Sequence, residues 1–317
     1  MDRLTFFADE NNLLNLKSLA LEFSSLSERR ILELYDLAGS FASAVLGQMS
    51  MGLSLFESLS MCVELPLSED YPIHPNSLNE NEGRIGLMLS LLRDEDRVIF
   101  ASLLSDELRG LGVDLSERDF LPRDSSSEVV AYVRNALSDE AFDVFSQTMT
   151  DPRVSYRSGL KECAAAVANG ECGFALLPLE ESGGVRLPTV AELLRKYDLK
   201  INAITPVFGP AADADLKYAL VASHFCIPSV SEDDDLYLEL RMASSEVELM
   251  RVLSACRLFG HTLFRMNSTL VYEDDEPIPY FNLVLRDNGR RGFGRLLLYL
   301  ALFSEDHVTE GIYKNLE

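Results

Sequence analysis

The sequence predicts a multidomain α+β protein with an all-helical N-terminal domain, a central α/β domain and a C-terminal domain of ferredoxin-like order. Three observations predict this fold class: apolar residues at helical spacing over the first 120 residues, strands alternating with helices between residues 129 and 222, and a β-α-β-β-α-β order after residue 235. A chain of 317 residues suits two or three domains. We expect these domains to cover residues 1–125, 127–225 and 232–317.

The N-terminal region has the apolar pattern of long amphipathic helices. Between residues 12 and 50, apolar side chains recur every three to five positions, at Leu26, Ile31, Leu34, Leu37, Phe41, Val45 and Met49. A proline-containing stretch at 65–81 ends this pattern, and helical spacing returns at 85–92 and 98–108. We therefore predict a helical domain in which Leu34, Phe41 and Val45 are buried.

The central region alternates between strand and helix patterns. A polar segment at 123–128 separates it from the helical region. Strands are predicted at 129–133, 154–156, 173–177, 200–207 and 217–222, and helices at 138–149, 160–169 and 188–197. Because strands that are separated by helices pair through parallel crossovers, we expect a mainly parallel sheet.

The C-terminal region follows an acidic run at 231–235, which is best solvated in a linker. Strands are predicted at 236–241, 262–270, 280–285 and 309–313, and helices at 246–259 and 292–302, with His261 ending the first helix. This order is that of the ferredoxin-like split unit. Since such a sheet has helices on one face only, we expect a homodimer in which this sheet or the helix at 246–259 packs against the same surface of a second copy.

Composition and charge exclude several classes of function. The 51 acidic and 28 basic residues give a net charge of −23, which repels phosphate backbones and anionic lipids, so we expect no nucleic-acid or membrane partner. The five cysteines include no C-x-x-C pair and the four histidines are not paired at helical spacing, so no metal, disulfide or cofactor is expected. The absence of a leader-like start and of a spanning segment predicts a cytoplasmic protein.

Several short motifs follow one another in an informative order. Residues 129–133 (VVAYV) precede 137–142 (LSDEAF), residues 156–170 end in AAAVANG, and residues 173–182 read GFALLPLEES. Shorter matches follow at 249–253, 266–270, 280–281 and 311–313. With the apolar pattern of 31–49, these motifs resemble the bifunctional chorismate mutase–prephenate dehydratase family, whose chains end in an ACT domain. The resemblance implies mutase-like helices, a dehydratase domain of the periplasmic-binding-protein type and a ligand-sensing ACT domain.

The residues on which the two reactions of that family depend are largely replaced. The arginine and lysine of the mutase helix correspond to Ala38 and Met49, and the motif asparagine of the dehydratase corresponds to Glu181. Ser138 and Ser182 are the matching remnants, and no residue is assigned to catalysis. About a dozen residues stand where the family inserts its second lobe, so a single lobe is expected. One wall cannot exclude water from a reaction.

The resemblance also implies a ligand-binding set. It consists of Glu181 and Ser182 after a dehydratase strand, Glu246 and Val247 where the family has the glycine beside phenylalanine, and Asn267 and Ser268 in the counterpart of its ESRP segment. The expected ligand is a small carboxylate or an amino acid. Phenylalanine in the family's pose is disfavoured, since Val247 adds bulk where a glycine lets the ligand approach.

Three functions are compatible with these observations. The first is a catalytically impaired relative, or pseudoenzyme, that binds a small carboxylate, an amino acid or a partner subunit in phenylalanine biosynthesis. The alternative is an active chorismate mutase or prephenate dehydratase with a rebuilt active site. A third is an interaction protein that acts through its helical domain. Assays with chorismate and prephenate separate the first two, and partner capture by residues 1–125 tests the third.

Overall fold

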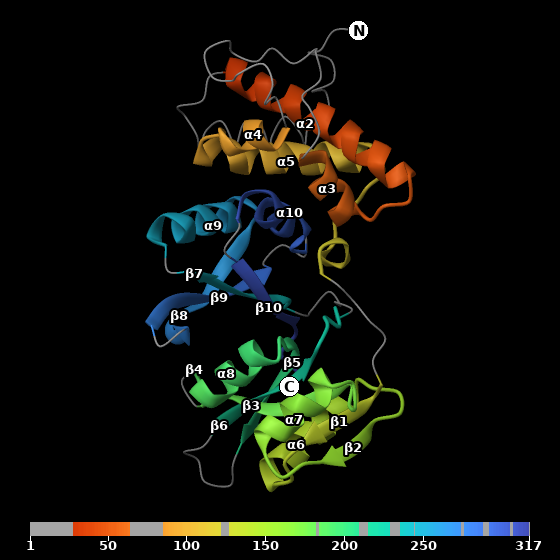
Figure 1. The fold of residues 1–317 in the computed structure, drawn as a ribbon, viewed down its shortest axis with the longest axis vertical. Helices are drawn as coiled ribbons and strands as arrows, with labels where there is room; N and C mark the ends of the chain where they lie inside the picture. The colour runs from red at the N-terminus through yellow and green to blue at the C-terminus, as the bar shows by residue number, and fades with distance from the viewer. Residues whose placement is uncertain are drawn as a thin grey trace. The chain divides into compact units, whose positions relative to one another are not determined.

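The computed structural model describes residues 28–63, 85–121, 127–181, 184–208, 215–228, 235–243, 245–273, 276–287, 292–304 and 307–316. The chain divides into two compact units, Met1–Phe120 with Gly294–Glu305, and Leu121–Phe293 with Asp306–Glu317. The described part of the first unit is helical, and the second contains a large sheet with helices (Figure 1). This is the mixed class that the sequence predicts, while the division into three domains stays a prediction.

The helical unit contains α2 (Glu28–Ser50), α3 (Leu55–Val63), α4 (Ile85–Ser90), α5 (Asp94–Gly110), the 3-10 turn η2 (Glu117–Asp119) and α10 (Gly294–Phe303). Leu34, Phe41 and Val45 are buried, as predicted. The rings of Phe41 and Phe100 meet edge to face with centroids 6.1 Å apart, and Phe100 makes the same contact with Phe303. The core therefore joins α2, α5 and α10. The predicted helical residues 12–27 lie outside the described residues.

A buried carboxylate lies in the first turn of α5. The side chain of Asp96 is 0% exposed and pairs with Arg30 at 3.0 Å and with Arg93 at 3.3 Å. A helix N-terminus favours negative charge, and the two guanidinium groups offset the cost of burying this one. Ala38 is also wholly buried, within the apolar core of the same unit. The two arginines therefore converge on a carboxylate of the protein.

The second unit follows the predicted order of elements. Its central part contains β1 (Val129–Tyr132), α6 (Ala136–Ser146), β2 (Arg153–Tyr156), α7 (Leu160–Ala168), β3 (Phe174–Glu181), β4 (Val185–Arg186), α8 (Pro188–Lys196), β5 (Lys200–Phe208) and β6 (Asp215–Ala222). Its C-terminal part contains β7 (Tyr237–Ala243), α9 (Glu246–Leu258), β8 (His261–Glu273), β9 (Glu276–Asp287) and β10 (His307–Tyr313). The short strand β4 is the element that the sequence analysis missed.

The strands form one mixed sheet in the order β2-β1-β3-β6-β5-β10-β7-β9-β8, with β4 paired to β3. β1 is parallel to β2 and β3, but β6 is antiparallel to both of its neighbours, β3 and β5. The prediction of a mainly parallel sheet is therefore wrong. Only residues 209–214 separate β5 from β6, and a parallel return needs a dozen or more residues, so the chain turns back antiparallel.

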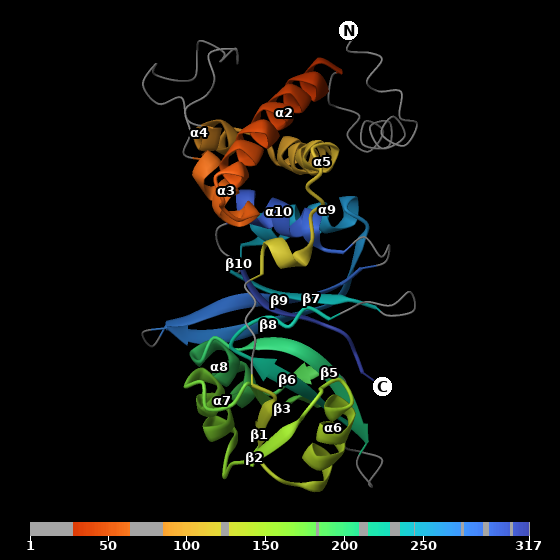
Figure 2. The same cartoon turned by 90° about the vertical axis from the view of Figure 1, so that its right-hand side faces the viewer.

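Helices cover both faces of the central part of the sheet. Buried residues of α7 and α8, such as Val167 and Leu194, pack with Ala131 of β1 on one face. Phe145 of α6 packs with Val130 and Tyr132 of the same strand on the other face. Figure 2 shows α7 and α8 on one side and α6 on the opposite side. A strand buried on both faces explains the continuous apolar run at 129–133.

The C-terminal strands pair antiparallel in the order β10-β7-β9-β8, and the predicted β-α-β-β-α-β order of elements is present. β10 also pairs in parallel with β5, through Gly311 and Ile201. The prediction that His261 ends a helix is wrong. Gly260, at φ 86°, turns the chain after α9, so that His261 enters the sheet opposite Asp287.

No helix within the described ranges is both long enough and apolar enough to cross a membrane.

Candidate functional site

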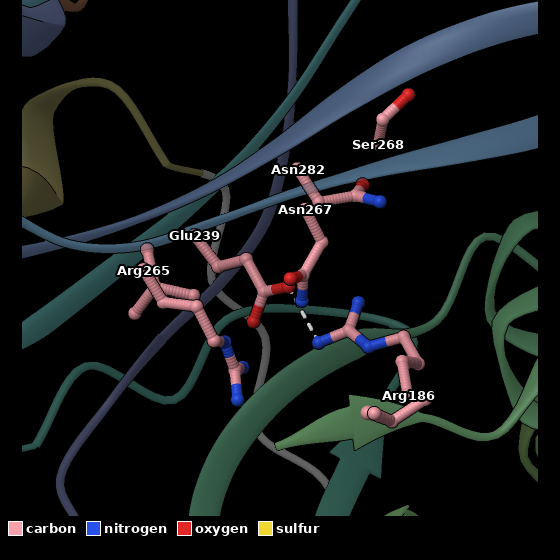
Figure 3. A pocket seen from close by; sticks show the side chains of 8 residues that line it. Arg186, Glu239, Arg265, Asn267, Ser268 and Asn282 are labelled. Atoms are coloured by element: carbon pink, nitrogen blue, oxygen red, sulfur yellow. Dashed lines mark ion pairs between the residues drawn. The ribbon is translucent and has the colours of Figure 1, made fainter. Parts of the chain in front are cut away.

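A cavity of about 200 Å³ lies in the second unit, where β4 meets the C-terminal strands (Figure 3). It is lined by Val185 and Arg186 of β4, Glu239 of β7, Arg265, Asn267 and Ser268 of β8, and Asn282 and Val284 of β9. Pockets for drug-sized ligands are usually about 300–1,000 Å³, so this cavity suits a smaller molecule. Six of the eight lining side chains are polar or charged, which indicates a hydrophilic ligand.

The sheet register explains why polar side chains gather on this face. Arg265 of β8, Val284 of β9 and Glu239 of β7 lie on one rung, and Asn267 faces Asn282 two residues along. Alternate residues of a strand share a face, so both rungs present their side chains on the same side. The intervening positions of β7 are buried and apolar, and comprise Leu238, Leu240 and Met242. The sheet is therefore apolar on one face and polar at the cavity.

Arg186 is the buried cation at the centre of the site. Its side chain is 7% exposed; Nη2 lies 2.5 Å from Oε1 of Glu239, and Nη1 lies 3.0 Å from Oε2 of Glu310. A third carboxylate, Glu180, is 4.0 Å away. Burial by itself lowers the pKa of Arg186. The nearby carboxylates together raise this pKa by a larger amount, so the net shift is upward. The guanidinium therefore stays charged and holds the carboxylates together. Figure 3 shows it facing Glu239 from the β4 side.

Arg265 fixes the second wall of the cavity. Both of its terminal nitrogens donate to Glu180, with Nη1 2.6 Å from Oε2, in a two-bond geometry that holds the guanidinium plane. Nη1 also donates to the carbonyl of Gly184 at 3.2 Å. Gly184 has φ 78°, and a Cβ at this position would lie 2.9 Å from that nitrogen. The turn before β4 therefore needs glycine both for its backbone conformation and for the space that Arg265 occupies.

Glu239 is the acid that lines the cavity. Burial raises the pKa of this carboxyl, whose side chain is 1% exposed, and the nearby Arg186 acts in the opposite direction. The hydroxyl of Tyr313 donates to its Oε2 at 3.2 Å. Burial also raises the pKa of Tyr313 well above its ordinary value, so this tyrosine acts as a hydrogen-bond donor.

This arrangement has the parts of a binding site. Arg186 and Arg265 can hold a carboxylate, Glu239 can hold an ammonium group, and the lining also contains the amides of Asn267 and Asn282. Among the described residues that line the cavity there is no cysteine or histidine, and Ser268, which is exposed, is the one among them with a hydroxyl group. Among the described residues, no group of three or more His, Cys, Asp or Glu side chains could hold a metal ion.

The structure brings together part of the predicted ligand-binding set. Asn267 and Ser268 line the cavity. Glu181 ends β3 with an exposed side chain, next to the buried Glu180, and Ser182 lies outside the described residues. Val247 is 59% exposed on α9 and is not among the lining residues, and Glu246 is the first residue of that helix.

Ser138 has a structural contact in place of a substrate contact. It is 2% exposed and lies in the first turn of α6, where Asn135 caps the helix. The Ser138 hydroxyl accepts from the backbone N–H of Asn135 at 2.9 Å and is 2.7 Å from the carbonyl of Val133, to which it donates. The backbone N–H of Ser138 also donates to Oδ1 of Asn135 at 3.0 Å, which completes a capping box and stabilises the helix start.

Sequence reasoning missed the charged residues Glu180, Arg186, Glu239 and Arg265 of the site, and also the amide of Asn282. One signal was present in β7, where Glu239 and Arg241 alternate with apolar residues in a strand that otherwise reads as buried. Charges inside such a strand need partners, because an unpaired buried charge is costly. The partners themselves lie far along the chain, and no local pattern identifies them.

No protein-family model matches the chain, and no curated protein matches it significantly. Solved structures to which it is similar include one described as "GqqA- a novel type of quorum quenching acylases", at 20% identity and a TM-score of 0.45 over 60% of this chain and 96% of that chain. A prephenate dehydratase from Streptococcus mutans matches at 16% identity and a TM-score of 0.48, over 60% of this chain and 100% of that chain. A prephenate dehydratase from Arthrobacter aurescens, in complex with L-Phe, matches at 12% identity and a TM-score of 0.41, over 58% of this chain and 89% of that chain.

Proposed function

We propose that this protein is a catalytically impaired relative of the chorismate mutase–prephenate dehydratase family, which binds a small carboxylate or amino acid in the context of phenylalanine biosynthesis. The observation that carries the proposal is the polar cavity. It contains Asn267 and Ser268, from the segment that resembles the family's ligand-binding ESRP motif, together with the cations Arg186 and Arg265. Binding in place of turnover is the role that these groups support.

The positions that correspond to the family's reaction chemistry support the loss of catalysis. Ala38, at the place of the mutase arginine, is an apolar core residue. Arg30 and Arg93 are engaged by Asp96, which leaves less of their charge for a dicarboxylate substrate. Ser138 is occupied in the cap of α6. These contacts stabilise the fold. They do not build a cleft in which a reacting substrate would be protected from water.

The proposal is tested with purified full-length protein in two measurements. Turnover of chorismate and of prephenate should not exceed the uncatalysed background. Thermal denaturation with millimolar amino acids and carboxylates should show a rise in Tm for at least one compound, because binding to the folded state stabilises it. Asn267→Ala should abolish that rise, and Asn169→Ala, an exposed asparagine at the end of α7, should preserve it.

Turnover above background would contradict the loss of catalysis and would favour the alternative of a rebuilt active site. A rise in Tm that Asn267→Ala leaves unchanged would show that a ligand binds elsewhere. If no compound raises Tm, the binding role of the cavity fails.

A further inference from the structure

The charges around the cavity are already balanced by the protein itself. Three arginines and three glutamates form one connected cluster: Arg186, Arg241, Arg265, Glu180, Glu239 and Glu310. Lys217 adds a partly exposed charge, 39% exposed and 3.9 Å from Glu180. The six members of the cluster therefore sum to zero when all are ionised, and a ligand with a large net charge would disturb this balance.

The cavity nevertheless presents both signs of charge to a ligand. Arg186 and Arg265 line it as cations, and Glu239 lines it as an anion. Figure 3 shows Glu239 and Arg186 facing each other beside the amide of Asn267. A molecule that carries a carboxylate and an ammonium group can meet an opposite charge at each end without changing the net charge of the cluster. A dianion would instead add two negative charges to a cluster of arginines and glutamates whose charges already sum to zero.

The neutral part of the lining is also polar. Asn282 is 9% exposed and is the backbone partner of Asn267 in the pairing of β8 with β9. Of the lining residues that the structure describes, Val185 and Val284 are the two with apolar side chains. An aromatic ring placed here would displace water from polar side chains without offering them hydrogen bonds, and this desolvation costs free energy.

We propose that the cavity binds a small zwitterionic α-amino acid with a hydrogen-bonding side chain, such as serine, threonine, asparagine or glutamine. The carboxylate lies toward the two arginines, the ammonium group toward Glu239, and the side chain toward Asn267 and Asn282. Dicarboxylates and phenylalanine are excluded, the first by charge and the second by the polar lining. This inference rests on the proposed binding function and narrows its ligand class.

The test is isothermal titration of the full-length protein with L-serine, L-threonine, L-asparagine and L-glutamine, beside L-phenylalanine and succinate. At least one of the four polar amino acids should bind, and at least about tenfold more tightly than phenylalanine or succinate. Asn282→Leu removes the amide at similar volume and should weaken that binding by about tenfold or more, the size of one buried hydrogen bond. Should this variant fail to fold, Asn267→Ala, at a partly exposed position, takes its place. Asn169→Ala is the matched control and should bind as the unchanged protein does.

A charge variant gives an independent result. Glu239→Gln keeps the shape of the side chain but removes one negative charge, so the cluster gains a net positive charge. Amino-acid binding should weaken about tenfold or more, and succinate binding should strengthen. Succinate or phenylalanine binding to the unchanged protein, lost in Asn282→Leu, would overturn the zwitterion inference while the binding function stands. If none of the six compounds binds, the inference of a zwitterionic ligand is wrong. The wider Tm screen then shows separately whether the protein binds any other small carboxylate or amino acid.

Discussion

Single residues determine the shape of the cavity wall, and Gly184 is the clearest example. Its φ of 78° favours glycine, and the space that a Cβ would take is filled by Nη1 of Arg265. The bidentate pair of Arg265 with Glu180 depends on that space. Gly170 has a similar φ of 73° but nothing within 4 Å of its missing Cβ. Comparing substitutions at the two glycines therefore separates the cost of backbone strain from the cost of the contact with Arg265.

We expect Gly184→Ala to lower the free energy of unfolding by about 1–3 kcal/mol. This cost has two parts: the strain of alanine in the left-handed backbone conformation, and the close contact of its Cβ with Arg265. Gly170→Ala should cost about 1 kcal/mol, from strain alone. Urea denaturation of both variants measures the difference. Equal losses in the two variants would show that Arg265 moves aside freely, and the contact at Gly184 would then be unimportant.

The thiol of Cys226 provides a test of local electrostatics. Burial raises its pKa from the ordinary 9.0 to about 11, although this cysteine is only partly buried. A raised thiol pKa favours the protonated form, so at pH 8 the nucleophilic thiolate should be about 100-fold scarcer than for an ordinary cysteine. Alkylation by iodoacetamide, followed by mass spectrometry, should accelerate about tenfold per pH unit below pH 11. Fast alkylation of the native protein at pH 8 would indicate that His224, whose Nε2 is 3.5 Å from the sulfur, stabilises the thiolate.

At the scale of secondary-structure elements, the pairing of β5 with β10 is the most important contact. It joins the central strands to the C-terminal strands in one sheet. The pairing passes through Gly311, where an added Cβ would lie 2.7 Å from the Cβ of Ile201 and 2.8 Å from its carbonyl oxygen. The cavity depends on this pairing, because β4 lines it from the central part of the sheet and β7 lines it from the C-terminal part.

We expect Gly311→Ala to destabilise the protein by about 1–3 kcal/mol, because backbone and core atoms on both sides must shift. Gly47→Ala is the control, because Gly47 lies inside α2 and a Cβ there meets nothing within 4 Å. Chemical denaturation followed by circular dichroism compares the two. An unchanged midpoint for Gly311→Ala would show that β5 and β10 pair too loosely to couple the two parts of the sheet.

At the scale of the whole molecule, we propose self-association through the C-terminal part of the sheet unit. Val247 and Met250 are 59% and 61% exposed, and they lie on one side of α9 at a spacing of three residues. Exposed apolar side chains that share a helix face are typical of a surface that a second copy can cover.

Light scattering of the full-length protein at tens of micromolar should give the mass of a dimer. The double substitution Val247→Asp with Met250→Asp should give a monomer, because it places charges in the interface. Met51→Asp, at a residue of the helical unit that is 68% exposed, should leave the mass unchanged. A monomeric unchanged protein, or a dimer that survives the double substitution, would contradict this surface as the interface.

Local patterns were sufficient to predict most of the elements. Helical spacing predicted α2 and the burial of Phe41, and the alternation of strands and helices predicted the order from β1 to β6. The resemblance to a known family placed Asn267 and Ser268 in a ligand site, and the structure brings both into one cavity. These features depend on residues close together in the sequence, where periodicity and motif spacing carry the information.

The sequence by itself therefore determined the order of helices and strands, the acidic character of the chain and two residues of the cavity. Only the tertiary structure decided the mixed pairing of the sheet, the joining of β5 with β10, and the charge cluster around Arg186. That arginine meets Glu239 and Glu310 across 53 and 124 positions of the chain. Such contacts arise because buried charges must find partners after the strands have assembled, and the choice among distant partners depends on the three-dimensional fold.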